Sequence, residues 1–384
     1  MQSSPLLTAP GAVAADGADA GIAAHYGDPF AEQRALAGAL GLVDRSHRGV
    51  ILIAGQDRLS WLHSLTTQDL EHLAPGSTAE ALILSPNGHV EHHLTLTDDG
   101  THLWAHVEPG AAASLLEFLE SMRFMLRVES ADVSADYAVL TVMGPDAELV
   151  PGGTTPPRAQ AAEIADWTKA TAAARTHAFG MDVIVPRDRL AEAAEDLQAR
   201  GAVLAGIWAY EALRIAARRP RLGLDTDHRT IPHEVGWIET AVHLNKGCYR
   251  GQETVARVHN LGHPPRRLVF LHLDGSEDRL PAHGDPVSLD GTGGGAAGGV
   301  SGGAAGVVGG AATGGAVGFV GSAARHYELG PIALAMVKRT IPVDVPLLAG
   351  GLAAAQEVIV PPDAGANVKL TLRRPKADLI RSHE

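Results

Sequence analysis

Alternating hydrophobic and polar positions divide the first half of the chain into short strands and helices. Residues 49–55, GVILIAG, form a β-branched run that is typical of a strand, and residues 56–70 then carry leucines at helical spacing. Three strand-like runs follow between residues 79 and 107, separated by turn sequences at 86–88 and 98–100. This order predicts an antiparallel meander packed against helices, which is an α+β layer.

The same patterns return in the middle of the chain and then change. Residues 109–126 and 206–219 each place apolar side chains on one helical face, and residues 180–202 predict a strand, a turn and a helix. After Arg267 the chain has only short strand-like runs separated by glycine and proline. This change predicts a C-terminal all-β domain.

Two segments lack the composition of a packed core. Residues 1–22 are mostly small or polar, so they bury too little apolar surface to offset the entropy lost on ordering, and we expect a flexible tail. Residues 291–316 are rich in glycine but lack the following helix and the lysine of a phosphate-binding loop. We therefore expect a flexible insert between two strands of the C-terminal domain.

Composition and charge narrow the possible partners. A chain of 384 residues exceeds the size of one hydrophobic core, so two or three domains are expected. The net charge of −13 argues against direct nucleic-acid binding, although basic residues between Arg214 and Arg267 could bind a small anion or form a solvated face. No apolar run approaches the roughly 18 residues of a membrane span, which argues against a membrane partner. The single cysteine and the N-terminal composition favour a reducing cytoplasm.

The sequence HVEHH, residues 89–93, contains three histidines but no complete metal site. On a strand, His89 and His93 share one face while His92 points to the other. No cysteine or paired carboxylate nearby completes a tetrahedral set, so we expect no metal here.

Cys248 is the only cysteine of the chain. Lys246 and Arg250 flank it and would favour the thiolate, while Gly247 and Gly251 allow a sharp turn or a close approach to a ligand. These features predict a nucleophilic or redox-sensitive thiol. A buried structural cysteine is the alternative.

The string around Cys248 resembles the signature of the YgfZ-type folate-binding proteins, to which mitochondrial iron–sulfur assembly factors are related. The string comprises Lys246, Gly247, Cys248, Tyr249, Arg250, Gly251, Gln252 and Glu253, followed by Ala256, Arg257, His259, Gly262 and Arg267. Residues 41–76, 142–145 and 320–339 also resemble the wider family that includes the glycine-cleavage T-protein. The resemblance runs from about Gly41 to Glu357, without the tail and the glycine-rich insert.

This resemblance implies an α+β fold with two interleaved α+β subdomains over residues 23–265 and a C-terminal antiparallel β-barrel over residues 266–384. It implies tetrahydrofolate, or another reduced folate, in a central channel, with Cys248 as the reactive group. An anionic folate tail would suit cations, and polar side chains could bind the edges of the pterin; salt bridges are the alternative role for each. The expected folate-binding residues are Lys246, Gly247, Tyr249, Gly251, Gln252, Glu253, Arg257 and Arg214.

Two positions depart from the T-protein pattern. Its adjacent aspartates, one of them catalytic, match His92 and His93 here, and its pterin-binding glutamate matches Ala216. We therefore do not expect aminomethyl transfer. The resemblance instead implies a folate-binding factor that supports assembly or repair of iron–sulfur clusters in client enzymes, with a link to tRNA modification. A folate-dependent one-carbon transferase and a binding scaffold with an inert cysteine are the alternatives.

Overall fold

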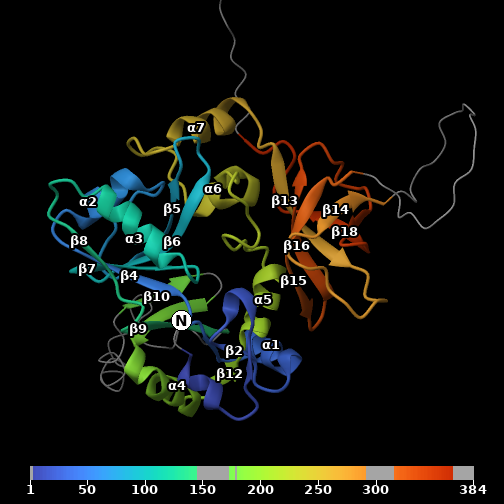
Figure 1. The fold of residues 1–384 in the computed structure, drawn as a ribbon, viewed down its shortest axis with the longest axis horizontal. Coiled ribbons are helices and arrows are strands. Elements are labelled where there is room, and N and C mark those ends of the chain that lie inside the picture. The colour runs from blue at the N-terminus through green and yellow to red at the C-terminus, as the bar shows by residue number, and fades with distance from the viewer. Residues whose placement is uncertain (1–2, 145–172, 178–179, 291–314, 366–384) are drawn as a thin grey trace, which may run out of the picture.

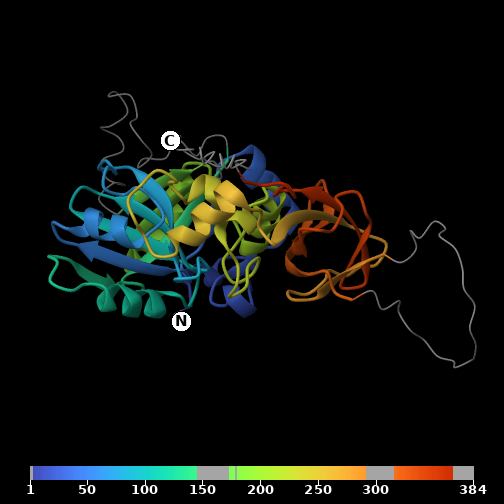
Figure 2. The same ribbon diagram turned by 90° about the horizontal axis from the view of Figure 1, so that it is seen from above.

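The computed structural model describes residues 3–144, 173–177, 180–290 and 315–365. Two sheets with their helices form one end of the molecule and a β-barrel forms the other (Figure 1). Seen from above, the barrel is set apart at one end of the long axis (Figure 2). The predicted α+β class with a C-terminal antiparallel barrel is confirmed. Within the described residues, no helix is both long and apolar enough to cross a membrane.

The first sheet contains the predicted meander. Its strands, in spatial order, are β5 (Thr78–Leu84), β6 (Val90–Asp98), β7 (His102–Val107), β4 (Gly49–Ala54) and β8 (Glu129–Asp132). All neighbours in this sheet are antiparallel. The helices α2 (Arg58–Leu65) and α3 (Ala112–Ser121) pack on one face, where their leucines share a core with the alternate residues of the strands.

The second sheet is interleaved with the first along the chain. Its strands, in spatial order, are β10 (Ala173–His177), β11 (Gly180–Pro186), β9 (Tyr137–Met143), β3 (Gly41–Asp44) and β12 (Val203–Ala205). The chain leaves this sheet after β3, forms the whole first sheet, and returns as β9. Only β12 and β3 are parallel. Val50, Trp104, Val139 and Ile184 pack between the two sheets.

Three helices cover the second sheet. The helix α4 (Leu190–Ala199) packs on one face, and α1 (Pro29–Gly38) and α5 (Ile207–Ala216) pack on the other. Each face of this sheet is therefore buried, so its strands are apolar at consecutive positions rather than at alternate ones.

The flexible tail predicted for residues 1–22 is wrong from residue 3 onward. The Ser4 amide donates to the Gly21 carbonyl at 2.8 Å, and β1 (Val13–Ala14) pairs with β2 (Ala23–His25). Leu6 is buried against the α4 side of the second sheet, and Ile22 is buried beneath α5. The Asp19 carboxylate also pairs with Arg221 and with His47, both at 2.9 Å, so charge pairs hold this segment together with its two large apolar side chains.

The barrel closes with six strands. Their spatial order is β13 (Arg266–Leu273), β16 (Gly330–Lys338), β15 (Gly318–His326), β14 (Pro286–Leu289), β17 (Leu347–Ala349) and β18 (Leu352–Val358). Every neighbouring pair is antiparallel. The glycine-rich segment, residues 291–316, joins the neighbours β14 and β15. Its residues 291–314 lie outside the described residues, so its expected flexibility stays a prediction.

A buried charged cluster joins α5 to the barrel. Asp225 is 0% exposed and accepts from the Arg214 guanidinium at 2.9 Å and from the Ser322 hydroxyl of β15 at 2.6 Å. Arg214 also pairs with Glu211 at 2.7 Å. The charges inside this contact are thus paired, as buried charges must be.

Candidate functional site

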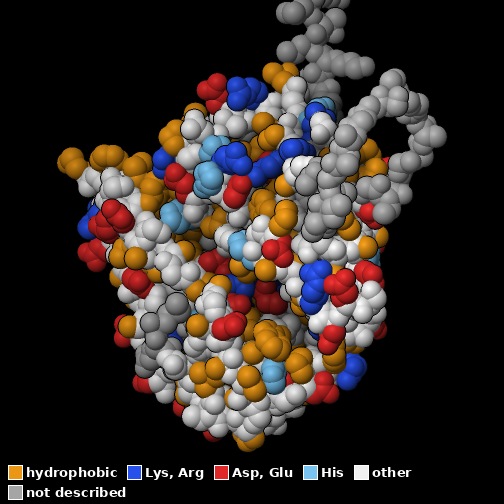
Figure 3. All heavy atoms as spheres, turned by 45° about the vertical axis from the view of Figure 1, so that its right-hand side comes forward, with side chains coloured by type: hydrophobic (Ala, Val, Ile, Leu, Met, Phe, Trp, Pro, Cys, Tyr) orange, Lys and Arg blue, Asp and Glu red, His pale blue; other side chains and the backbone are white. Residues whose placement is uncertain are grey.

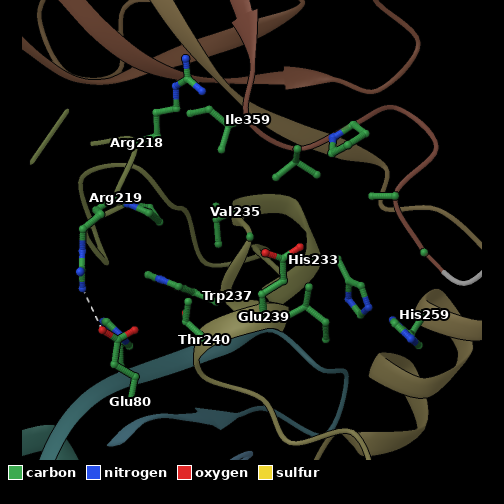
Figure 4. A pocket seen from close by; sticks show the side chains of 18 of the residues that line it. Glu80, Arg218, Arg219, His233, Val235, Trp237, Glu239, Thr240, His259 and Ile359 are labelled. Atoms are coloured by element: carbon green, nitrogen blue, oxygen red, sulfur yellow. Dashed lines mark hydrogen bonds and ion pairs between the residues drawn. The ribbon is translucent and has the colours of Figure 1, made fainter. Parts of the chain in front are cut away.

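A cavity of about 920 Å³ lies between the first sheet, the segment from residue 217 to 244, and the chain that follows β18. Figure 4 shows the side chains that reach into it. Its volume lies within the range of small-molecule sites, roughly 300–1,000 Å³. The polar residues that line it include Glu80, His93, Arg218, Arg219, His233 and His259, and Trp237 supplies an aromatic wall.

A glycine in the left-handed backbone conformation positions two of the residues that line the cavity. Gly236 has φ +79° and stands between the 3-10 helix η5 (Pro232–Val235) and the short helix α6 (Trp237–Thr240). Most side chains rarely adopt this backbone conformation, so glycine permits the sharp turn. As a result, His233 of η5 and Trp237 of α6 both line the cavity.

One wall combines an aromatic plate with a paired carboxylate. The His93 ring stacks on the Trp237 ring, with centroids 4.7 Å apart and planes at 24°. The Glu80 carboxylate lies 2.9 Å from the Arg219 guanidinium and 3.6 Å from Nε2 of His93 (Figure 4). Trp237 is only 3% exposed, so a planar heterocycle in the cavity would meet the small part of this aromatic pair that faces it, with the Glu80 carboxylate beside it.

A second wall carries two histidines from different elements. His233 is 2% exposed, and its ring lies 5.9 Å from that of His259, on α7 (Gln252–Leu261). Figure 4 shows the two rings side by side. Burial, and secondarily the nearby His259, lower the pKa of His233 to about 4, so its imidazole is neutral at pH 7.

The predicted separation of the histidines in HVEHH is confirmed for His92 and His93. His93 lines the cavity, whereas His92 is buried on the other face of β6, where its ring lies 6.3 Å from that of Phe118. Burial lowers the pKa of His92 to about 4. His89 precedes the strand. Across the ranges that the structure describes, no three His, Cys, Asp or Glu side chains are placed to hold a metal ion.

Lys246 has a structural role, because it binds backbone carbonyls of a neighbouring segment. Its ammonium donates to three backbone carbonyls, those of His63, Thr66 (2.6 Å) and Gln68 (3.0 Å). His63 lies in the last turn of α2, and the other two lie in the chain that follows it. Burial lowers the pKa of Lys246 to about 8. The ammonium thus holds the chain that leads from α2 into β5, the strand that carries Glu80.

The second cation beside Cys248 is also engaged elsewhere. Arg250 pairs with Glu91 of β6 at 3.1 Å and lies 5.5 Å from the Phe118 ring. Cys248 itself is exposed, so the alternative of a buried structural cysteine is wrong. The thiol is accessible to solvent, but the flanking cations have carbonyl and carboxylate partners.

The rest of the signature shapes the chain around α7. Gly251 has φ +81° and lies so close to the hairpin between β5 and β6 that a Cβ there would be 2.6 Å from the Ser85 carbonyl oxygen. Tyr249 is buried, which raises its pKa to about 12, and Gln252 donates to the Lys246 carbonyl at 3.4 Å. Glu253 and Arg257 are exposed on α7, and Gly247 is exposed in the loop.

None of the nine residues expected to act in catalysis or folate binding is among the described residues that line this cavity. Eight of them form the loop and helix beside it, and the ninth, Arg214, is buried in the cluster with Asp225. Ala216 precedes Ala217, which does line the cavity. On the face drawn in Figure 3, Lys, Arg and His side chains gather in the upper half, a local basic surface on an acidic chain.

The sequence could have indicated Glu80 but not the two histidines of the second wall. In the β5–β6 hairpin, Glu80 pairs with Thr95 and Leu82 with His93, so alternation puts Glu80 on the face of His93. His233 and His259 belong to separate elements, and no local pattern relates them.

Most of the chain is similar in sequence to known proteins. The family model of the GCVT N-terminal domain matches residues 6–246. The chain is 28% identical to an aminomethyltransferase of Symbiobacterium thermophilum, over 70% of this chain and 76% of that protein. It is 26% identical to a putative chloroplastic transferase of Arabidopsis thaliana, over 65% of this chain but only 59% of that protein's length.

The fold has a counterpart among solved structures. The crystal structure of glycine cleavage system aminomethyltransferase T from Bartonella henselae superposes with a TM-score of 0.70 at 18% identity, covering 92% of this chain and 94% of that one. At this identity the likeness shows the fold alone.

Proposed function

The chain belongs to the family of the GCVT N-terminal domain, and from this premise we propose that it binds a reduced folate, tetrahydrofolate, in the cavity of about 920 Å³. The observation that carries the proposal is the wall formed by the stacked His93 and Trp237 rings beside the Glu80–Arg219 pair. A pterin is planar and has several N–H groups along one edge. Its ring would stack against Trp237 while the Glu80 carboxylate accepts from that edge.

The residues first expected to bind folate take an indirect part in this proposal. Lys246 holds the chain before β5, and Gly251 lets α7 approach the hairpin that carries His93. They therefore support the cavity rather than contact its ligand. Ala216 leaves no carboxylate at the position where T-proteins are expected to bind the pterin, and Glu80 supplies one from a different element.

The proposal is tested by a fluorescence-monitored titration with tetrahydrofolate. We expect saturable quenching, because the ligand would stack on Trp237. Loss of a hydrogen bond to a charged group is worth about 1.5–3 kcal/mol, so Glu80→Gln should weaken binding by about tenfold or more. Trp237→Leu should remove most of the quenching and also weaken binding. Glu129→Gln, on the exposed edge strand β8 of the same sheet, is the matched control and should bind like the parent.

Absence of saturable quenching in the parent protein would contradict the proposal. So would equal affinities of the parent, Glu80→Gln and Trp237→Leu when binding is followed by calorimetry. Thermal melting of each variant establishes that it is folded.

We further propose that folate binding serves the assembly or repair of iron–sulfur clusters in client enzymes of the cytoplasm, with Cys248 as the reactive group. The support is the resemblance of residues 246–253 to the YgfZ-type signature, together with the exposure of the thiol. An iron–sulfur cluster usually has four thiolate ligands, so the remaining ligands would come from an assembly or client protein. Aminomethyl transfer is not proposed, because His92 and His93 replace the expected aspartates.

The variant Cys248→Ser separates this role from folding. Because the side chain is exposed, the free energy of unfolding should change by no more than about 0.5 kcal/mol, and the affinity for tetrahydrofolate should not change. We expect the variant to fail to restore iron–sulfur enzyme activity in cells that lack the protein. Full restoration by the serine variant would show that the thiol has no chemical role.

A further inference from the structure

His233 is a buried imidazole whose hydrogen-bonding capacity is unused. It is 2% exposed, and with respect to the described part of the chain neither Nδ1 nor Nε2 has a hydrogen-bond partner. Buried polar side chains are nearly always hydrogen-bonded, so a native side chain without partners calls for an explanation. Its ring lines the cavity, where Figure 4 shows it next to His259. Because both nitrogens are themselves buried, a partner that enters through the cavity reaches them only if the ring turns towards it.

The two arginines that line the cavity already have carboxylate partners. Arg219 pairs with Glu80 at 2.9 Å, and Arg218 pairs with Glu357 at the end of β18. The charge of each guanidinium is therefore already balanced, although its remaining N–H groups could still donate to a ligand. The imidazole of His233 has no such partner among the pairs that the structure describes.

Charged groups lie on each of the elements that carry or pack near the two histidines. On its own element, Glu234 is buried and paired with Arg266 of β13 at 2.9 Å. The others are Glu239 of α6, Glu253 and Arg257 of α7, and Asp363 in the chain after β18, all four of them exposed to solvent. Solvent screens these exposed charges, so the protonation of His233 depends mainly on its burial and on the neighbouring His259.

We propose that His233 and His259 form the recognition site for a carboxylate of the ligand, and that binding is accompanied by proton uptake at this pair. The inference rests on the proposed function, because the glutamyl tail of a folate supplies such carboxylates. One proton moves from solvent to an imidazole nitrogen, an N–H bond forms, and the resulting imidazolium donates to the carboxylate. No covalent bond of the ligand changes.

The charge of the ligand sets the direction of this coupling. In the free protein, burial and the neighbouring His259 keep His233 neutral. A carboxylate placed beside the rings, at a nitrogen edge, supplies an opposite charge and an acceptor, both of which favour the protonated form. Affinity should therefore rise as pH falls from 8 to 6, by at most tenfold per pH unit for each proton taken up.

Calorimetric titration in two buffers of different ionisation enthalpy measures this proton uptake directly. With tetrahydrofolate at pH 7, we expect net uptake by the parent protein, and clearly less uptake with at least a fivefold loss of affinity in His233→Gln and in His259→Gln. His228→Gln, at an exposed position outside the cavity, is the matched control and should behave as the parent. Two variants on different elements guard against one that fails to fold.

Two truncated ligands separate this inference from the proposed function. Tetrahydropteroate, which lacks the glutamate, should bind without the proton uptake of the tail and should be insensitive to His233→Gln. p-Aminobenzoylglutamate, which lacks the pterin, should bind weakly but with proton uptake. Saturable binding of tetrahydrofolate with equal uptake in the parent and both variants would overturn the carboxylate site while the folate proposal stands. Failure of all three ligands to bind the parent protein would overturn both.

Discussion

Between pH 7.5 and pH 5, we expect the unligated protein to lose about 6 kcal/mol of its free energy of unfolding. Three histidines are buried and neutral in the folded chain. Burial is the main cause that lowers their pKa from 6.5, to about 4 in His92, about 3 in His106 and about 4 in His233. On unfolding each regains an ordinary pKa and binds a proton that the folded state does not bind. Each therefore costs about 2 kcal/mol at pH 5.

The sign of this pH dependence follows from the direction in which the three histidine pKa values are shifted. Because these pKa values are lower in the folded state, the contribution of the three histidines to stability is present above about pH 6.5 and is lost as the pH falls towards 4. The strongly paired carboxylates Asp19 and Asp227 have lowered pKa values, so they contribute mainly below this window.

Urea unfolding at pH 7.5, 6.5 and 5 measures this loss. His92→Leu should reduce the loss by about a third, because it removes one of three buried histidines. His72→Gln, at a side chain that is 80% exposed, is the control and should keep the full pH dependence. An unfolding free energy that stays constant across this window, or the same loss in His92→Leu as in the parent, would show that these imidazoles are not held neutral by burial.

The variant Arg214→Met should lower the free energy of unfolding by about 3–5 kcal/mol, because it leaves two buried carboxylates without their counter-charge. Arg214 pairs with Glu211 at 2.7 Å and with Asp225 at 2.9 Å, and Asp225 is completely buried at the contact with the barrel. Methionine keeps much of the volume but supplies no charge and no donor.

Chemical unfolding of Arg214→Met should be compared with that of Arg189→Met. Arg189 pairs with Glu192 on the surface of α4, and loss of such an exposed pair costs about 0–1 kcal/mol. Well below its melting temperature, Arg214→Met should bind tetrahydrofolate as the parent does. Equal stabilities of the two variants would contradict the structural role, and a selective loss of folate affinity in Arg214→Met would restore its expected place in the binding site.

Much of the fold could be predicted from the sequence, because its patterns are local. Strand alternation and the turns at residues 86–88 and 98–100 predicted the meander, and the change after Arg267 predicted an all-β C-terminal domain, which the family resemblance specified as a barrel. The ordered N-terminal segment could not be predicted in this way. Its anchors, Leu6 and Ile22, are held by α4 and α5, which lie far away in the sequence.

The candidate site was predictable only where residues close in sequence also act together. The resemblance of residues 41–76 and 142–145, which lie within the matched range, led to the family, and strand alternation separated His92 from His93 correctly. A sequence does not show which group a lysine side chain will bind. Lys246 was therefore expected to bind the ligand, although its ammonium binds backbone carbonyls. The pairing of His233 with His259 depends on how η5 packs against α7, which is a tertiary contact.

The most direct measurement is a crystal structure of the protein grown with 5-formyltetrahydrofolate, a stable reduced folate. We expect its pterin against the Trp237 ring, within hydrogen-bonding distance of Glu80, and its glutamyl carboxylate beside His233 and His259. A folate bound elsewhere, for example against the outer surface of the loop that carries Cys248, would contradict the proposed site. An empty cavity at saturating ligand would contradict the proposed function itself.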